Sequence, residues 1–252
     1  MLTERTKAIK DRLFAHARTV SLERSLLYTE SYRLTEGEPP VIRRAKALAH
    51  LLANHRIVVD ELDLLVGNRS AEPRAGVLSP EMSPYWILDE LDEFPTRPQD
   101  TFDMSEGDKD RYRTELYPFW AGRSLNDWYR AHADAEVMEA QKTRIFSVAQ
   151  TDKGQGHIIC DFELVLHQGF GALLADARAR AEAAPENDFY RAAVICLEAM
   201  VAMSGATRPR CASRSRVPRR SARPSWGGWR TSWPTWPPSP RATSTTPCSS
   251  CG

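Results

Sequence analysis

The sequence predicts a mainly α-helical fold with a few short strands, followed by a disordered tail. Apolar residues recur at helical spacing through most of residues 1–204, as in the face that contains Ile42, Ala45 and Leu48. Strand signals are short and few. Residues 205–252 contain no Asp, Glu, Lys, Leu or Ile, and their prolines and arginines leave too little apolar content for a packed core. We therefore expect two parts, a helical part that covers 1–204 and an Arg-, Pro- and Trp-rich tail that covers 205–252.

Helix starts are marked by capping residues and by proline. After the turn that contains Gly37, Pro39 or Pro40 is suited to open a helix, because the first turn of a helix has no acceptors for its N–H groups. We expect side-chain caps at Ser21, Ser83, Ser105, Ser124 and Asp161. The apolar side chains expected to face inward include Ile9, Leu13, Phe14, Leu22, Leu26, Phe162, Val165, Leu166, Leu173, Ala192, Ile195 and Ala199.

The apolar period changes after Asn54. Ile57, Val58 and Val59 form a short continuous apolar run, and the chain then continues to Gly67. A run of this length that ends at glycine is typical of a strand. We expect a short strand over these residues.

Charge is distributed unevenly between the two parts. The chain has 34 Lys and Arg against 33 Asp and Glu, but nine of the basic residues and none of the acidic ones lie in the tail. The helical part therefore carries a formal −8 and the tail +9. Four tryptophans accompany the tail arginines, a combination that also occurs in arms that bind nucleic acid.

Cysteine spacing and hydropathy predict a reduced, soluble, cytoplasmic protein. None of the five cysteines has metal-ligand spacing, apart from Cys248 and Cys251, which lie in the tail. The amino terminus has no signal-peptide apolar segment, and no uninterrupted apolar stretch reaches the roughly 18 residues that a membrane helix needs. We expect no membrane association, no nucleic-acid partner and no metal site.

Short motifs follow one another in a fixed order between residues 20 and 204. They are Glu23-Arg24, Thr29-Glu30-Ser31, Thr35-Glu36-Gly37, Arg43-Arg44-Ala45, Val66-Gly67-Asn68, Pro80-Glu81, the segment Tyr117 to Trp120, and the segment Gly156 to Phe170. In this order they resemble the amino-terminal region of the glycyl radical enzymes, the pyruvate formate-lyase-like family. The likeness is nearest to the glycerol or diol and hydroxyproline dehydratase branch of that family.

The resemblance implies the amino-terminal helical part of an α/β barrel. Intact enzymes of the family cleave C–O or C–C bonds of small hydroxylated substrates by radical chemistry, and they are homodimers. A radical-SAM activase installs a glycyl radical near the carboxyl end, and a mid-chain cysteine relays it to the substrate. This chain contains no match to the motif of the radical glycine or to the motif of the mid-chain cysteine. The resemblance implies no cofactor bound by this chain itself. We therefore expect a truncated, inactive fragment of a lyase, with no catalytic residue in this chain.

The resemblance also suggests two substrate-binding residues. His157 follows Gly154 and Gly156, which allow a close approach of the backbone to a ligand, and the matching family histidine resembles a contact to a substrate hydroxyl. A histidine that only hydrogen-bonds to a helix start is an equal alternative. Asp161 is expected to cap the following helix, and it is also suited to orient His157.

The tail has the amino-acid composition that GC-rich DNA gives when it is translated in a wrong frame. With suitable codons for residues 243–252, a shift of one base reads FHDALQLLW, which resembles a family F.EA.Q..W segment. The same shift converts the residues from Gly205 into RYAA, which resembles a family RYA motif. We expect a frameshift near residues 203–206. The alternatives are a nucleic-acid-binding arm and a disordered linker, and for the whole chain a binding protein without catalysis.

Overall fold

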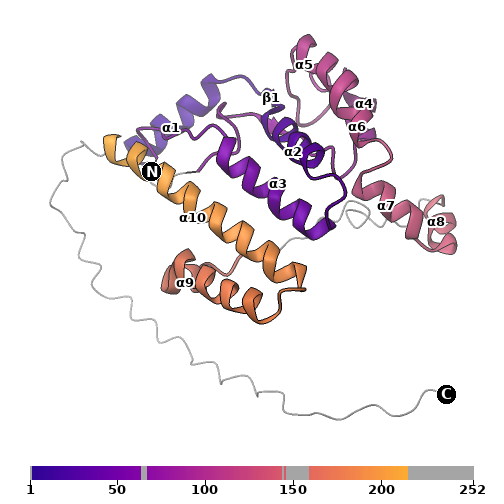
Figure 1. Cartoon of the computed structure of the whole chain (residues 1–252). Coiled ribbons are helices and arrows are strands. Elements are labelled where there is room, and N and C mark those ends of the chain that lie inside the picture. Colours follow the sequence, from indigo (N-terminus) through magenta and orange to yellow (C-terminus); the bar gives the residue numbers. More distant parts are fainter. Residues whose placement is uncertain (1, 64–66, 144, 146–158, 215–252) are drawn as a thin grey trace, which may run out of the picture. The chain divides into compact units, whose positions relative to one another are not determined.

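The protein is described by a computed structural model, which covers residues 2–63, 67–143, 145 and 159–214 (Figure 1). The prediction of a mainly helical fold with a few short strands is confirmed. In the described part of the chain, the elements are α1 Glu4–Ala15, β1 Val20–Ser21, α2 Glu23–Leu34, α3 Pro40–Asn54, β2 Gly76–Val77, α4 Tyr85–Glu90, α5 Glu106–Arg111, the π-helical turn η1 Tyr112–Leu116, α6 Tyr117–Trp120, α7 Leu125–His132, α8 Ala135–Gln141, α9 Phe162–Ala183 and α10 Asp188–Arg214.

The strands β1 and β2 form a two-stranded parallel sheet. Val20 pairs with Gly76 and Ser21 pairs with Val77. The prediction that Ser21 caps the next helix is therefore wrong, since Ser21 lies in a strand and α2 begins after Leu22 without a side-chain cap. A capping residue is recognised by local sequence, whereas this pairing joins segments more than fifty residues apart, a separation that local sequence does not encode.

The predicted caps at three other helices are confirmed. The Ser105 side chain accepts a hydrogen bond from the Asp108 N–H, and Ser124 forms a reciprocal capping box with Asp127. Asp161 caps α9. The prediction for Ser83 is wrong, because α4 begins after Pro84 and has no side-chain cap.

The strand predicted from Ile57 is absent from the described residues, and residues 64–66 lie outside them. The Asn68 side chain takes the place of a partner strand. Its Nδ2 donates to the carbonyls of Arg56 at 2.9 Å and Ser70 at 3.0 Å, and its Oδ1 accepts from the Val58 N–H at 3.1 Å. The Val58 N–H and the Arg56 carbonyl are thus paired without a sheet, by a side chain ten or more residues away that local composition does not reveal.

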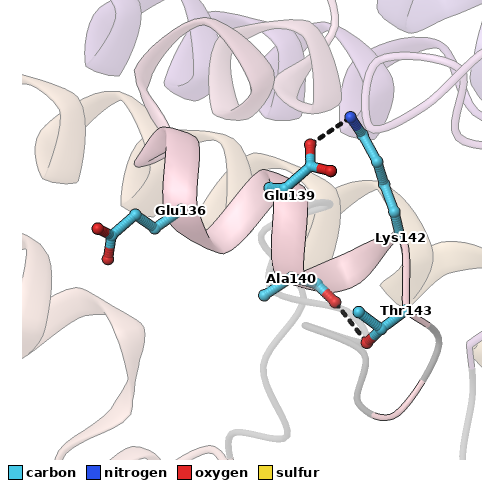
Figure 2. A pocket seen from close by; sticks show the side chains of 5 residues that line it. All are labelled: Glu136, Glu139, Ala140, Lys142 and Thr143. Carbon is cyan, nitrogen blue, oxygen red and sulfur yellow. Dashed lines mark hydrogen bonds and ion pairs between the residues drawn. The ribbon is translucent and has the colours of Figure 1, made fainter.

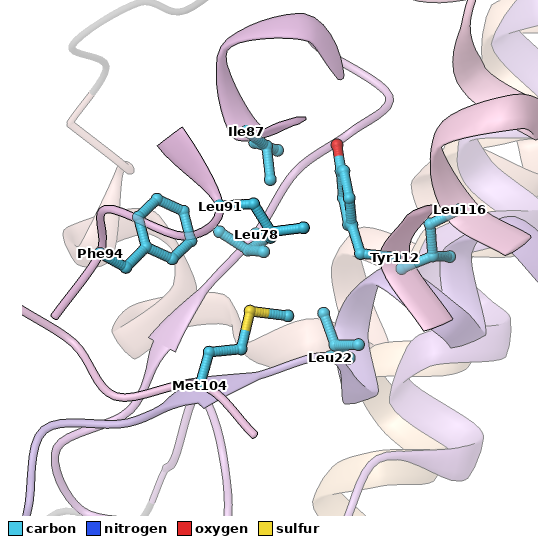
Figure 3. Packing of buried hydrophobic residues seen from close by; sticks show 8 residues of the cluster. All are labelled: Leu22, Leu78, Ile87, Leu91, Phe94, Met104, Tyr112 and Leu116. Atoms are coloured by element: carbon cyan, nitrogen blue, oxygen red, sulfur yellow. The ribbon is translucent and has the colours of Figure 1, made fainter. Parts of the chain in front are cut away.

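The main apolar core lies between α2, α4 and η1 (Figure 3). Figure 3 shows its members pointing toward one another: Leu22, Leu78, Ile87, Leu91, Phe94, Met104, Tyr112 and Leu116. Tyr112 is fully buried, and its hydroxyl donates to the Pro84 carbonyl at 2.8 Å. Burial raises the pKa of the Tyr112 phenol, so the group stays neutral and keeps this hydrogen bond.

A buried ion pair joins α2 to the segment that leads into α4. Arg24 Nη2 lies 2.6 Å from Glu81 Oε1, and Arg24 Nη1 lies 3.2 Å from Oε2. The Glu81 side chain is 3% exposed. The Glu81 carbonyl in turn accepts from the Leu125 N–H at 3.0 Å, which fixes the start of α7. One carboxylate residue therefore links three helices.

The remaining helices pack around α3. Its predicted inward face is confirmed, since Ile42 and Ala45 are buried and form a cluster with Ala192 of α10. α10 runs along α3, and α9 packs on α10 (Figure 1). On the other side of α2, Trp120 Nε1 donates to Thr29 Oγ1 at 2.8 Å.

Two predicted inward faces are wrong. α1 buries none of its side chains, so Ile9, Leu13 and Phe14 are exposed. In α9 the buried residues are Leu174 and Ala177, whereas Phe162 and Leu166 are exposed. A helical period identifies an apolar face but not the partner that covers it. A kink at Gly169, with φ of 74°, separates the exposed first half of α9 from the packed second half.

α10 passes the composition change at residue 205 and continues to Arg214. Extending an existing helix costs much less than starting one, which explains how α10 crosses that change. The segment Asp188–Thr207, with a hydropathy of 1.4, is long and apolar enough to cross a membrane by length and composition alone. It packs on α3 and α9. Residues 215–252 lie outside the described residues.

The ion pair gives a prediction for stability. Glu81→Gln removes the buried charge that pairs with the partly buried Arg24, and we expect it to lower the free energy of unfolding by about 3 kcal/mol. Glu4→Gln breaks the exposed pair with Lys7 and serves as the matched control, with no measurable loss. Urea unfolding followed by circular dichroism measures both. Equal stabilities of the two variants would contradict the assigned role.

Candidate functional site

Of the two predicted site residues, Asp161 lies at the amino end of α9. Asp161 Oδ1 accepts a hydrogen bond from the Leu164 N–H at 2.9 Å, so the expected capping role is confirmed. The side chain is exposed. His157 lies outside the described residues, so its proposed contact with Asp161 or with a substrate stays a prediction.

The two described cysteines differ in environment. Cys160 is exposed and directly precedes Asp161, while Cys196 is half-buried against the cluster of Ile42, Ala45 and Ala192. Burial raises the pKa of the Cys196 thiol, which keeps it protonated and unreactive toward electrophiles. Neither thiol has a described basic partner that would activate it.

A shallow hollow lies on α8 and the turn after it (Figure 2). Its volume is about 530 Å³, and it is lined by Glu136, Glu139, Ala140, Lys142 and Thr143. Figure 2 shows Lys142 paired with Glu139, while the Thr143 hydroxyl donates to the Ala140 carbonyl at 2.7 Å. Lys142 and Glu139 are thus paired with each other, and the Glu136 carboxylate points away from them (Figure 2).

A larger groove of about 960 Å³ lies between α1 and the segment around residues 58–75. Arg12 Nη1 lies 2.7 Å from Asp60 Oδ2, and Arg5 Nε donates to the Leu62 carbonyl at 3.0 Å. These contacts hold α1 in place. Arg5 and Arg12 are thus used for structure.

Two carboxylates near the predicted turn and the predicted strand are exposed and lie close to arginines. Glu36 is exposed and lies 3.4 Å from Arg43, and Glu61 is exposed and lies 3.8 Å from Arg12. Within the described residues, no three His, Cys, Asp or Glu side chains are placed to hold a metal ion. The expectation that the chain has no metal site stays a prediction.

Several motif residues meet in a polar cluster that sequence reasoning missed. His55 Nδ1 lies 3.1 Å from Glu23 Oε2, and Glu23 Oε1 accepts from the Arg56 N–H at 3.0 Å. His55 Nε2 lies 3.0 Å from the Asn68 carbonyl. The cluster ties the start of α2 to the end of α3. Isolated polar residues beside apolar runs were its only sequence signal.

Comparison with known proteins identifies the family. A family model described as pyruvate formate lyase-like matches residues 2–218, which is most of the chain. The chain belongs to this pyruvate formate lyase-like family. It corresponds to the amino-terminal region of a glycyl radical enzyme, as the ordered motifs predicted.

Curated relatives and a solved structure agree with the family. The chain is 32% identical over 192 residues to a probable dehydratase, YbiW, of Escherichia coli, covering 71% of this chain and 24% of that protein. It is 32% identical over 168 residues to an isethionate sulfite-lyase of Desulfovibrio desulfuricans, covering 63% of this chain and 20% of that protein. The glycerol-bound B12-independent glycerol dehydratase of Clostridium butyricum superposes with a TM-score of 0.77 at 29% identity, covering 86% of this chain and 29% of that one. The chain thus spans about a quarter of these pyruvate formate lyase-like relatives.

The polar contacts of the described residues stabilise the packing of the helices more than they form a reactive site. In the described part of this pyruvate formate lyase-like chain, the ionisable groups with strong partners, such as Arg24 and Glu81, are tied to one another. The amino end of α9 is the one predicted binding region whose polar residue, Asp161, is exposed beside exposed apolar side chains.

Asp161 gives a prediction that separates capping from other roles. Asp161→Ala removes the acceptor for the Leu164 N–H and should lower the free energy of unfolding by about 1 kcal/mol. Asp161→Asn keeps a capping oxygen and should restore most of that loss. Thermal unfolding followed by circular dichroism at 222 nm checks this; a variant Asp161→Asn as unstable as Asp161→Ala would contradict the capping role.

Proposed function

We propose that this chain forms the amino-terminal helical part of a glycyl radical lyase or dehydratase and contains none of the reacting groups. The observation that carries the proposal is the family match over residues 2–218, together with the 24% share of YbiW that the chain covers. Dehydratase and sulfite-lyase relatives favour cleavage of a C–O or C–C bond, or a related bond, in a small hydroxylated substrate. By itself, the chain is expected to be inactive.

The role proposed for this part is structural. The Arg24–Glu81 pair and the Asn68 contacts hold α2, α3 and α7 in one fixed arrangement, which would support one side of the active-site barrel. His157 is proposed to contact a substrate hydroxyl, with Asp161 at the adjacent helix start. Such positioning contributes to catalysis by holding the substrate in a reactive geometry.

The radical groups of the family do not fit the residues of this chain. Of the two cysteines that the structure describes, Cys196 is half-buried in an apolar cluster, and Cys160 is exposed at a helix start. The intact enzyme would receive its glycyl radical from a radical-SAM activase and would act as a homodimer. No step of the reaction is assigned to this chain.

The absence of radical carriers gives a spectroscopic prediction. The purified chain, treated anaerobically with a family activase, reductant and S-adenosylmethionine, should show no glycyl radical doublet by electron paramagnetic resonance. An intact glycyl radical dehydratase activated by the same enzyme is the positive control. A doublet from this chain would overturn the proposal that it lacks the reacting groups.

We also propose that the tail is an out-of-frame translation. Its support is compositional: from Gly205 the acidic and aliphatic residues stop together, while the part of helix Asp188–Arg214 before Gly205 has an ordinary mixture of residues. Codons with A or T in the second position encode Asp, Glu and Leu, and these codons return when the frame is shifted.

The nucleotide sequence tests this directly. A one-base change between the codons for Glu198 and Arg208 should restore a frame that reads RYA, then an acidic helix that contains leucine, and that continues past Gly252. The restored stretch should regain an apolar period of about 3.6 residues. Early stop codons in both shifted frames, or a shifted frame without that period, would contradict the frameshift and favour a selected basic tail.

A further inference from the structure

Four arginines near the ends of α2, α3, α5 and α6 share two carboxylates. Glu115 lies between one pair of these arginines, at oxygen–nitrogen distances of 3.0 and 3.3 Å. Glu36 lies between the other pair, at 3.4 and 3.6 Å. We call the four the arginine cluster, and its two pairs are Arg111 with Arg33, and Arg43 with Arg123. The cluster therefore has a net positive charge, although residues 1–204 together carry an excess of acidic residues.

The centre of the arginine cluster lies at Phe119 of α6. The Cζ atoms of Arg33 and Arg123, one from each pair, lie 5.2 Å from the centroid of this half-buried ring, which is a cation–π distance. The two arginine side chains are 46% and 56% exposed. Within the described part of the chain, no carboxylate forms an ion pair with both of them. Each outer pair of the cluster thus has a bridging carboxylate, and the central pair has none.

The central guanidinium groups have donors to spare. A guanidinium has several N–H donors in a planar fork that matches a carboxylate. Arg33 donates to Glu115 at 3.3 Å, and the contact of Arg123 with Glu36, at 3.6 Å, is too long for a hydrogen bond. The cluster also favours the charged form of a carboxylate, because the hydrogen bond from Arg111 and the charges of Arg111 and Arg33 lower the pKa of Glu115.

We propose that the arginine cluster binds an acidic peptide segment of a partner protein, with one carboxylate of that segment between Arg33 and Arg123. This carboxylate completes the pattern that Glu115 and Glu36 form with their own arginine pairs, and its methylene groups lie on the Phe119 ring. An isolated exposed ion pair contributes little binding free energy. The partner segment therefore needs several carboxylates, which the outer arginines of the cluster also attract. This inference goes beyond the proposed function and does not depend on it.

A nucleic acid and a bilayer fit the arginine cluster less well than an acidic peptide. Single-stranded nucleic acids place phosphates along a basic groove and stack bases on exposed aromatic rings. Here Glu36 and Glu115 lie among the arginines and repel phosphates, and Phe119 is half-buried with two guanidinium groups near its ring. The same two carboxylates repel an anionic bilayer. A peptide can instead place its carboxylates between the arginines and leave these two positions free.

Binding of a hexaglutamate peptide to the full chain tests the proposal. Fluorescence anisotropy of the labelled peptide measures its affinity, and hexaglutamine is the uncharged control. We expect hexaglutamate to bind and hexaglutamine not to bind. The affinity for hexaglutamate should fall about tenfold when the ionic strength rises from about 0.01 to 0.15 M, because salt screens exposed charges. Inorganic phosphate, an oligothymidylate and phosphatidylglycerol vesicles are tested as competitors, and light scattering of the chain alone reports self-association.

Matched double variants locate the contact. Arg33→Gln with Arg123→Gln should weaken hexaglutamate binding about tenfold, because the two central guanidinium groups are lost. Arg178→Gln with Arg191→Gln removes the same charge from similarly exposed positions on α9 and α10 and should leave binding unchanged. Glu36→Gln should strengthen binding, since it removes a competing carboxylate, whereas a purely structural contact predicts no gain. Circular dichroism checks that each variant is folded.

The tail is a second possible site for an acidic peptide, because residues 205–252 contain nine arginines. A hexaglutamate that carries a photoreactive group distinguishes the two sites by crosslinking and mass spectrometry, and we expect crosslinks to residues 115–123. Crosslinks confined to 205–252, or equal affinities of the two double variants, would overturn the proposal. So would stronger competition by phosphate, the oligothymidylate or the vesicles than by unlabelled hexaglutamate, or a homodimer that the Arg33 and Arg123 substitutions dissociate.

Discussion

The arrangement of the described helices depends on the buried pair between Arg24 and Glu81. Removing a carboxylate from water costs several kcal/mol, and only close geometry offsets that cost. Here Arg24 and Glu81 form two nitrogen–oxygen contacts, of 2.6 and 3.2 Å. The Arg24 Cζ atom also lies 4.7 Å from the centroid of the Tyr28 ring. Since the Glu81 backbone fixes the start of α7, the pair sets the relation of α2 to the later helices.

A second set of polar contacts works in the same way. Asn68 satisfies three backbone groups, and Trp120 donates to Thr29, whose own hydroxyl donates to the Ser25 carbonyl at 2.7 Å. Buried polar groups that are fully hydrogen-bonded specify one packing arrangement, because each alternative would leave some of them unpaired. The motif residues that carry the family resemblance are thus largely structural, which fits a part that supports a site formed elsewhere.

The first half of α9 contrasts with this well-connected core. Around Arg24 nearly every polar group has a partner, whereas Phe162 and Leu166 expose most of their area. The same contrast separates α1, which buries nothing, from α3, whose inner face is covered. The matched region of this chain covers 24% of YbiW, so most of that relative has no counterpart here.

The sequence alone determined the helices around Pro40, Ser105, Ser124 and Asp161, because capping, proline and apolar period act within a few residues. It also determined the family, since the motifs occur in a fixed order. The tertiary structure decided what depends on distant partners: the pairing of Ser21 with Val77, the replacement of a strand by the Asn68 side chain, and the faces of α1 and α9 that stay uncovered. Asp161 was predictable as a cap, while the contacts of Glu81 were not, because an ion pair across 57 residues leaves no local signal.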